Sequence, residues 1–414
     1  MSPKIITFVR LVFLFSSLFT QIFANWVYDA SFRSNIGHDD NVFVSADSAN
    51  NKEETLFLST SISLNASYKK TTGNFFSASY NPVRTHYSGL DQDDHLAHTS
   101  TLKFKRSTSS DFTIKGSLFY KFIDGDTLTP EYTETAPTFL GGLATRDRHK
   151  AVISRQSLNM QWDFSDRSLI QLVFDGYYHD FQTKQFETND SKRPNGYINY
   201  VDRSIFNGGM NFGYKFIGDA YLTIGYRYGV GIQDNRPGTD IEYSNHFHRI
   251  LFGICGKVNE VLSFDFLTGP EIKEFTGQTT EGFDKQRSFW FANGSAQIDF
   301  SKLDTLKISV SRMPLQSYLG ASIYEDFKVV IDYSKKIRKS LSASATLTRY
   351  EGDWVSRQGI SRNDLLWSPA IALKHHAREN LLFECSYTHE STHSVVAEQE
   401  FKRTIITFGT QFSF

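Results

Sequence analysis

Hydrophobic and polar residues alternate along most of this chain with a period of two. In the final segment, 401–414, Ile406, Phe408, Phe412 and Phe414 share one face, whereas the other face is mostly polar. Such alternation is typical of a β-strand with one apolar and one polar side. Comparable segments of roughly 10 to 14 residues recur along the chain, which is long enough to cross a bilayer when tilted. They exceed the strands of most soluble domains.

The connectors between these segments are of two kinds, which alternate without a break. Short turns are predicted at 69–73, 107–111, 165–168, 217–219, 257–260, 301–304, 335–339 and 377–379. Longer polar loops are predicted at 45–53, 87–94, 124–148, 183–201, 234–244, 276–285, 316–322, 352–362 and 391–399. Short turns on one rim and long loops on the other are typical of a transmembrane β-barrel. The pattern predicts an all-β, antiparallel up-and-down barrel of about 18 strands, with both termini on the short-turn, periplasmic rim.

A soluble β-sandwich would show the same alternation, with its apolar faces turned inward. The length and number of the segments favour the barrel, and so do aromatic residues at the ends of the apolar series. We expect these aromatic residues to form a girdle beside the short turns at the membrane surface. Its predicted members are Tyr68, Phe122, Phe164, Phe216, Phe300 and Tyr333.

The first 24 residues have the form of a secretory signal peptide. Lys4 and Arg10 supply positive charge, 11–19 is apolar, and Ala24 ends a small-residue cleavage site. We therefore predict a signal peptide over 1–24, cleavage before Asn25 and one outer-membrane barrel over 25–414. The apolar run is too short to favour the alternative, a single transmembrane anchor.

Composition excludes several other classes of protein. No run of 18 apolar residues follows Asn25, which excludes a helical membrane protein. The formal net charge of −1 gives no general attraction to nucleic acid, and none is expected as a partner. Of the two cysteines, Cys255 is expected to face inward and Cys385 outward, so we expect no disulfide bond between them.

The polar faces of the strands would line the lumen. Fixing the parity of each strand by its apolar face gives the lumen-facing candidates Lys103, Lys105, Lys115, Lys121, Arg155, Asp163, Asp175, Lys215, Arg227, Arg249, Lys257, Asp265, Asp299, Lys307, Lys328, Asp332, Lys374, Glu384 and Arg403. Bases outnumber acids roughly two to one, and an excess of one charge on a pore wall biases permeation toward the opposite charge. The alternative is that these charges pair across strands and merely solvate the wall.

No motif for catalysis or metal binding stands out in the sequence. His246 and His248 share one strand face, and His375 and His376 are adjacent, but neither pair has a third ligand at zinc-site spacing. The acid-rich segments 38–41 and 91–95 fit solvated loops better than calcium sites. The chain has no serine nucleophile elbow and no phosphate-binding loop. We therefore expect no enzyme activity, no cofactor and no metal.

One local motif resembles a known family. The segment SFRSNIG (31–37) is followed by DDNVF (39–43), which resembles the start of the β-barrel porin 2 family. Chain length, the single-barrel layout and the terminal Phe are similar too. The resemblance implies a barrel associated with exopolysaccharide or capsule gene clusters, and hence a pore for polysaccharide export or oligosaccharide passage. It implies no individual ligand-binding residue.

We therefore expect an outer-membrane channel for small hydrophilic solutes or for polysaccharide and oligosaccharide, either passive or biased toward its substrate. The connector 124–148, with its apolar FLGGL stretch, is expected to fold inward and narrow the pore. The alternative is a non-conducting barrel that acts as an adhesin, a structural anchor or a lipid-associated enzyme. Expected partners are outer-membrane lipid, periplasmic polysaccharide-export components, and a barrel assembly machinery that recognises Phe412 and Phe414 as its signal.

Overall fold

The computed structural model of the chain describes residues 26–414, apart from 43, 45–46, 48–51, 70–72, 126–138, 141–142, 145–148, 188, 193–198, 236, 318–322, 356–361 and 396–399. Residues 1–25 lie outside the described residues. The signal peptide, its cleavage before Asn25 and the division of the chain at that point therefore stay predictions.

The described part of the chain consists almost entirely of β-strands. The strands are β1 (Trp26–Asp39), β2 (Thr55–Lys69), β3 (Phe75–Tyr87), β4 (His95–Ser107), β5 (Phe112–Asp124), β6 (Phe139–Leu140), β7 (Leu143–Ala144), β8 (Ala151–Ser165), β9 (Ser168–Phe181), β10 (Arg203–Ile217), β11 (Asp219–Gln233), β12 (Asn245–Lys257), β13 (Leu262–Phe275), β14 (Gln286–Ser301), β15 (Asp304–Gln316), β16 (Ile323–Arg338), β17 (Leu341–Val355), β18 (Arg362–Arg378), β19 (Leu381–Ser394) and β20 (Lys402–Ser413). One short 3-10 helix, η1 (Asp91–Asp93), lies between β3 and β4.

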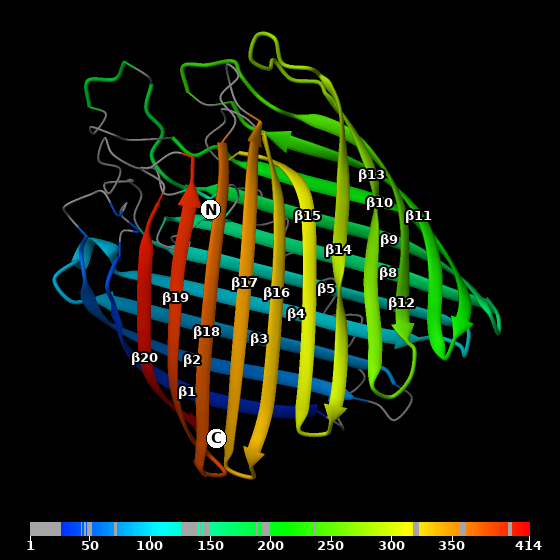
Figure 1. Cartoon of the computed structure of the whole chain (residues 1–414), viewed down its shortest axis with the longest axis horizontal. Coiled ribbons are helices and arrows are strands. Elements are labelled where there is room, and N and C mark those ends of the chain that lie inside the picture. The colour runs from blue at the N-terminus through cyan, green and yellow to red at the C-terminus, as the bar shows by residue number, and fades with distance from the viewer. Residues whose placement is uncertain are drawn as a thin grey trace.

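The wall is one closed antiparallel sheet of 18 strands (Figure 1). Each strand pairs with its neighbour in the chain, β5 pairs with β8, and β1 pairs with β20 to close the ring. Wall strands run from 12 residues in β20 to 17 in β18, which is the length that tilted strands need to cross a bilayer. The predicted antiparallel up-and-down barrel of 18 strands is confirmed.

The long connector between β5 and β8 contains an element that the pattern did not predict. Its strands β6 and β7 form a two-stranded hairpin outside the barrel sheet. β6 contacts β18, a strand far around the wall from β5 and β8. Most of the connector lies outside the described residues, so its inward fold stays a prediction. The contact between β6 and β18 is compatible with it.

Apolar side chains cover the outer face of the wall. Phe174, Ile224 and Phe408, on three different strands, each expose 44–50% of their surface. Exposed apolar residues in such numbers are unusual on a protein surrounded by water, but they match a lipid-facing wall. Closure of the sheet leaves no unpaired edge, as a strand-built membrane protein requires. The barrel is therefore an outer-membrane protein.

The aromatic girdle is present, with one error in its predicted membership. Phe164, Phe216 and Phe300 each stand one residue before the end of a strand at a short turn, and each exposes more than 40% of its surface. Phe122 was assigned to the wrong rim. It lies near the end of β5 that leads into the long connector, where its ring stacks on His98 at 6.0 Å. β5 begins at its short turn, so its apolar series ends at the opposite rim.

The Asp-Asp-Asn motif lies at the seam between the first and last strands. Arg403 donates from Nη2 to Asp39 Oδ2 at 2.6 Å and from Nε to Asp39 Oδ1 at 3.0 Å. The backbone N–H of Thr404 donates to Asp40 Oδ1 at 2.6 Å. Asn41 Nδ2 donates to the carbonyl oxygen of Lys402 at 3.1 Å. The motif that carries the family resemblance therefore joins β1 to β20.

Among the described residues, no helix is long and apolar enough to cross a membrane.

Candidate functional site

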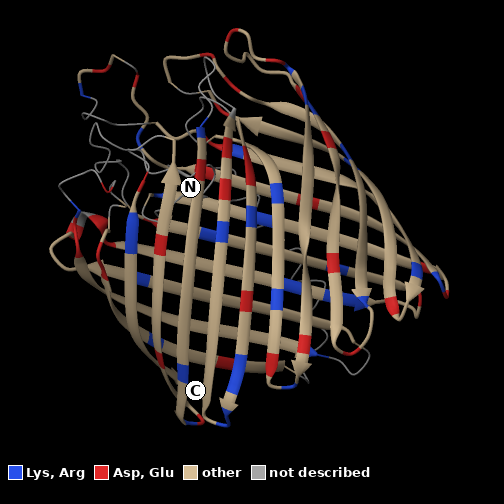
Figure 2. Cartoon of the chain, in the orientation of Figure 1, with Lys and Arg blue, Asp and Glu red and all other residues tan. Residues whose placement is uncertain are grey.

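Charged residues occur along the strands as well as in the loops (Figure 2). The strand register shows which face they occupy. Lys307 is opposite Gln297 on β14 and Asp332 on β16, whereas the next residue, Ile308, pairs with apolar residues on the outer face. By the same register the inner face carries Lys103, Lys115, Lys121, Arg155, Asp163, Lys215, Arg227, Arg249, Asp265, Asp299, Asp332 and Arg403.

Part of the lumen is a cavity of about 660 Å³ in the short-turn half of the barrel. Its lining comes from β5 and from β8 to β14 and includes Lys115, Arg227, Arg249 and Asp265. Six amide side chains also line the cavity: Asn159, Gln161, Gln171, Asn207, Asn211 and Asn293. The cavity therefore offers many hydrogen-bonding groups and charges of both signs to a solute.

The long-loop half of the lumen is packed with side chains. Arg203, at the start of β10, donates from Nη1 to Tyr324 Oη at 2.8 Å and also to the carbonyl oxygen of Gln316. All three residues are at most 4% exposed. β10 and β16 are six places apart in the wall, so these contacts span the interior instead of joining neighbours. They narrow the lumen at that level.

A buried ion cluster lies next to this constriction. Glu271 on β13 is fully buried and accepts from Arg249 Nε at 2.6 Å. Lys273 Nζ lies 3.4 Å from Glu271 Oε1 and donates to the carbonyl oxygen of Pro314 on β15 at 3.0 Å. The Arg249 guanidinium lies 3.5 Å from the ring centroid of Phe291. Loss of any one partner would leave a buried charge without compensation, so the members of this cluster depend on one another for stability.

The wall formed by β1, β18, β19 and β20 also pairs its charges. Arg33 Nη2 lies 2.9 Å from Glu384 Oε2, and Lys374 Nζ lies 3.6 Å from the same oxygen. Arg403 contacts both Asp39 and Glu390. On this wall these charges pair across strands and neutralise one another, so they do not bias the lumen toward ions of one sign.

The sequence analysis did not single out Arg203 and Tyr324 of the constriction, nor Glu271 and Lys273 of the ion cluster beside it. One signal was present. Glycine occupies three of the inward positions of β11, at 225, 229 and 231, and glycine inside a strand often marks a close approach. A Cβ built at Gly229 would lie 2.2 Å from the ring of Phe247 on β12. The missing side chain makes room for this buried ring.

His246 and His248 are on the outer face of β12, and each contacts a tyrosine of β11. Tyr226 Oη lies 2.7 Å from His248 Nδ1, and Tyr228 Oη lies 3.1 Å from His246 Nδ1. Among the described residues, no group of three or more His, Cys, Asp or Glu side chains is placed to hold a metal ion.

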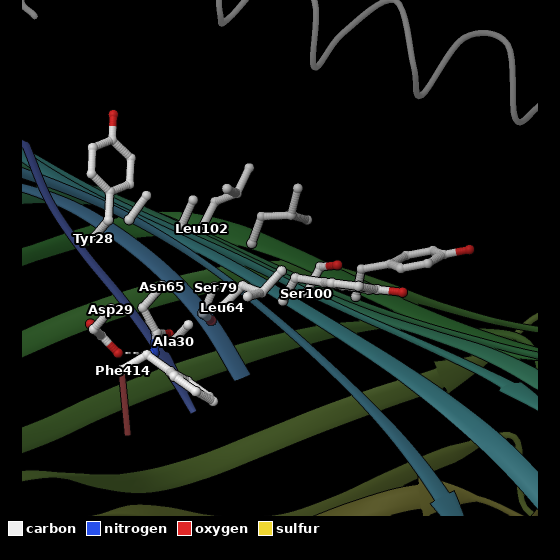
Figure 3. Close-up of a pocket in the computed structure, with 14 residues that line it drawn as sticks. Tyr28, Asp29, Ala30, Leu64, Asn65, Ser79, Ser100, Leu102 and Phe414 are labelled. Atoms are coloured by element: carbon white, nitrogen blue, oxygen red, sulfur yellow. Dashed lines mark hydrogen bonds between the residues drawn. The ribbon is translucent and has the colours of Figure 1, made fainter. Parts of the chain in front are cut away.

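A second hollow, of about 750 Å³, lies on the outer wall near the seam (Figure 3). Ala30, Leu64, Leu102 and Phe414 contribute to its mostly apolar lining. Because it belongs to the lipid-facing surface, it fits acyl chains of the surrounding bilayer and is separate from the lumen.

Comparison with known proteins identifies no family. No family model matches the chain, so its resemblance to the β-barrel porin 2 family stays a prediction. No curated protein matches it either.

Solved structures with a similar barrel share little sequence with this chain. OpdK of Pseudomonas aeruginosa, crystallised with vanillate, has 9% identity over 94% of this chain and 99% of its own, with a TM-score of 0.44. OccAB3 of Acinetobacter baumannii has 11% identity over 95% and 100%, with a TM-score of 0.42. The siderophore receptor PiuA of A. baumannii has 10% identity over 95% and 82%, with a TM-score of 0.45. At TM-scores below 0.5 these similarities carry no conclusion about what this chain transports or binds.

Proposed function

We propose that this protein is an outer-membrane channel for small hydrophilic solutes, with oligosaccharide or polysaccharide as the substrate class that its family resemblance implies. The observation that supports this function is a closed barrel of 18 strands whose inner face carries charges, amides and a cavity of about 660 Å³. Barrels of this size leave an aqueous interior unless inward-folded segments fill it. The contacts of Arg203 are then the constriction of the channel.

A second candidate function is favoured by the same constriction. If Arg203, Tyr324 and the ion cluster around Glu271 never separate, the barrel does not conduct. It would then act through its outer loops, as an adhesin, an anchor or a lipid-associated enzyme. As partners we propose outer-membrane lipid, periplasmic polysaccharide-export components and the barrel assembly machinery.

Single-channel recording in planar bilayers tests the proposed function. Arg203→Ala removes the side chain that spans the lumen, so its conductance is expected to exceed that of the wild type. Arg312→Ala is a matched control, because Arg312 lies on the outer face and pairs there with Glu325 at 3.0 Å. Conductance in wild type and a larger value only in Arg203→Ala support a channel. Absence of conductance in all three proteins supports the non-conducting barrel instead.

A further inference from the structure

The lumen wall formed by β2, β3, β4 and β5 differs in charge from the rest of the barrel. Its inward positions are rich in serine and threonine and, among the described residues, include no aspartate or glutamate. Lys103, Lys105 and Lys115 lie on it, near the short-turn end of β4 and β5. This wall is therefore positively charged, whereas β1, β18, β19 and β20 carry paired charges.

The three lysines lie close together by strand register. Lys105 is directly opposite Lys115, an arrangement that places Cβ atoms about 5 Å apart and destabilises the pair when both carry the same charge. Lys103 is two positions along the same face of β4, which adds a third ammonium group within roughly 7 Å along the strand. No acidic residue on the neighbouring positions compensates this charge.

In the described part of the chain, none of the three ammonium groups has a carboxylate within 4.0 Å. By contrast, Arg33, Lys374 and Arg403 each have such a partner. The side chains of Lys103 and Lys115 are exposed to the lumen. Lys115 also lines the cavity of about 660 Å³, so a solute in the cavity can reach it.

Polar groups that complement an oxyanion surround the lysines. Lys103 is opposite Ser77 and Ser117 on its two neighbouring strands. Lys115 is opposite Asn159, whose side-chain amide carries N–H donors. Hydroxyl and amide N–H groups donate to carboxylate or phosphate oxygens, and lysine is a common phosphate binder.

We propose that Lys103, Lys105 and Lys115 form a binding site for multivalent oxyanions at the short-turn mouth of the lumen. The ligand carries carboxylate or phosphate groups, and its binding relieves the repulsion between the opposed lysines. The inference rests on the proposed function only in that the lumen gives solutes access. It makes anionic molecules the favoured class of solute and places their first contact on the β4–β5 wall.

Unfolding of the purified barrel in liposomes tests the site without requiring conductance. Inorganic phosphate and citrate are titrated separately, each against sodium chloride of equal ionic strength, to separate binding from charge screening. A bound anion raises the unfolding midpoint by mass action, and Lys105→Gln/Lys115→Gln is expected to lose roughly half or more of that rise. Lys374→Gln is the matched control, because it removes a paired lumen lysine near the same rim.

A rise that is lost only in the double variant supports the site, and the relative effects of phosphate and citrate identify the preferred group. An equal rise in all three proteins means a general salt effect and overturns the proposal, as does no rise above chloride in the wild type. Without added anion, Lys115→Gln is expected to raise the midpoint and Lys374→Gln to lower it. The reverse order would contradict the opposed-lysine argument. Current recordings remain a separate test, since a non-conducting barrel can still bind the anion.

Discussion

Replacing Asp39 by asparagine tests whether the seam between β1 and β20 depends on its buried ion pair. The side chain of Asp39 is 2% exposed and that of Arg403 is 14% exposed. Removing one partner of a buried pair costs about 3–5 kcal/mol. Glu390, 3.4 Å from Arg403, remains as an acceptor, so we expect a loss at the lower end, about 3 kcal/mol of unfolding free energy.

The matched control for Asp39→Asn is Asp219→Asn. Asp219 pairs with Lys215 at 2.6 Å, as short as the seam contact, but its side chain is 78% exposed. Solvent screens exposed pairs, so they contribute little, and this variant should be nearly as stable as the wild type. Urea unfolding in liposomes, followed by tryptophan fluorescence, measures both losses. Equal losses in the two variants would refute the view that burial at the seam makes the ion pair strong.

Three further outcomes are expected. Ile298→Arg, on the lipid face near the short turns, should destabilise the barrel by about 1 kcal/mol. Gln297→Arg should leave unfolding in liposomes unchanged and shift the reversal potential toward anion selectivity. If Gln297→Arg were the more destabilising variant, the assignment of the lipid and lumen faces of β14 would be wrong. Removal of Phe414, which is 78% exposed, should lower the amount of folded barrel in the outer membrane on heat-modifiability gels without changing the unfolding free energy of the barrel that does assemble. Burial, with the charges of Asp180 and Asp234, raises the pKa of Asp202 from 3.8 to about 7. Because the folded protein then binds the proton more tightly than the unfolded chain, the free energy of unfolding falls as pH rises from about 4 to 7. Asp202→Asn should abolish that dependence in urea titrations.

Much of the fold could be predicted from the sequence because its signals are local. Alternation along 56–68 or 401–414 assigns a face to every side chain, and turn length distinguishes the two rims. Once each strand pairs with the next, the register follows from the apolar face. The error at Phe122 shows the limit of this reasoning, since the direction of a strand, and not its pattern alone, decides at which rim an aromatic residue lies.

The arrangement of the site depended on contacts that alternation does not encode. Parity placed Lys374 and Lys115 on the same face, but only the structure shows that the first shares Glu384 with Arg33. The constriction joins Arg203 to Tyr324, which is 121 positions away in the chain. Such contacts follow from how the ring bends, and a period of two carries no information about that bend.

Before the ring closes, β1 and β20 are the two free edges of an open sheet. Such edges attract strands of other molecules, and inward-pointing charges are one way in which proteins prevent this pairing. Arg33 and Asp39 place charges on one edge and Arg403 on the other, and the ion pair between Asp39 and Arg403 forms only when the correct two edges meet. The residues that hold the finished wall together thus also protect the unfinished one from aggregation.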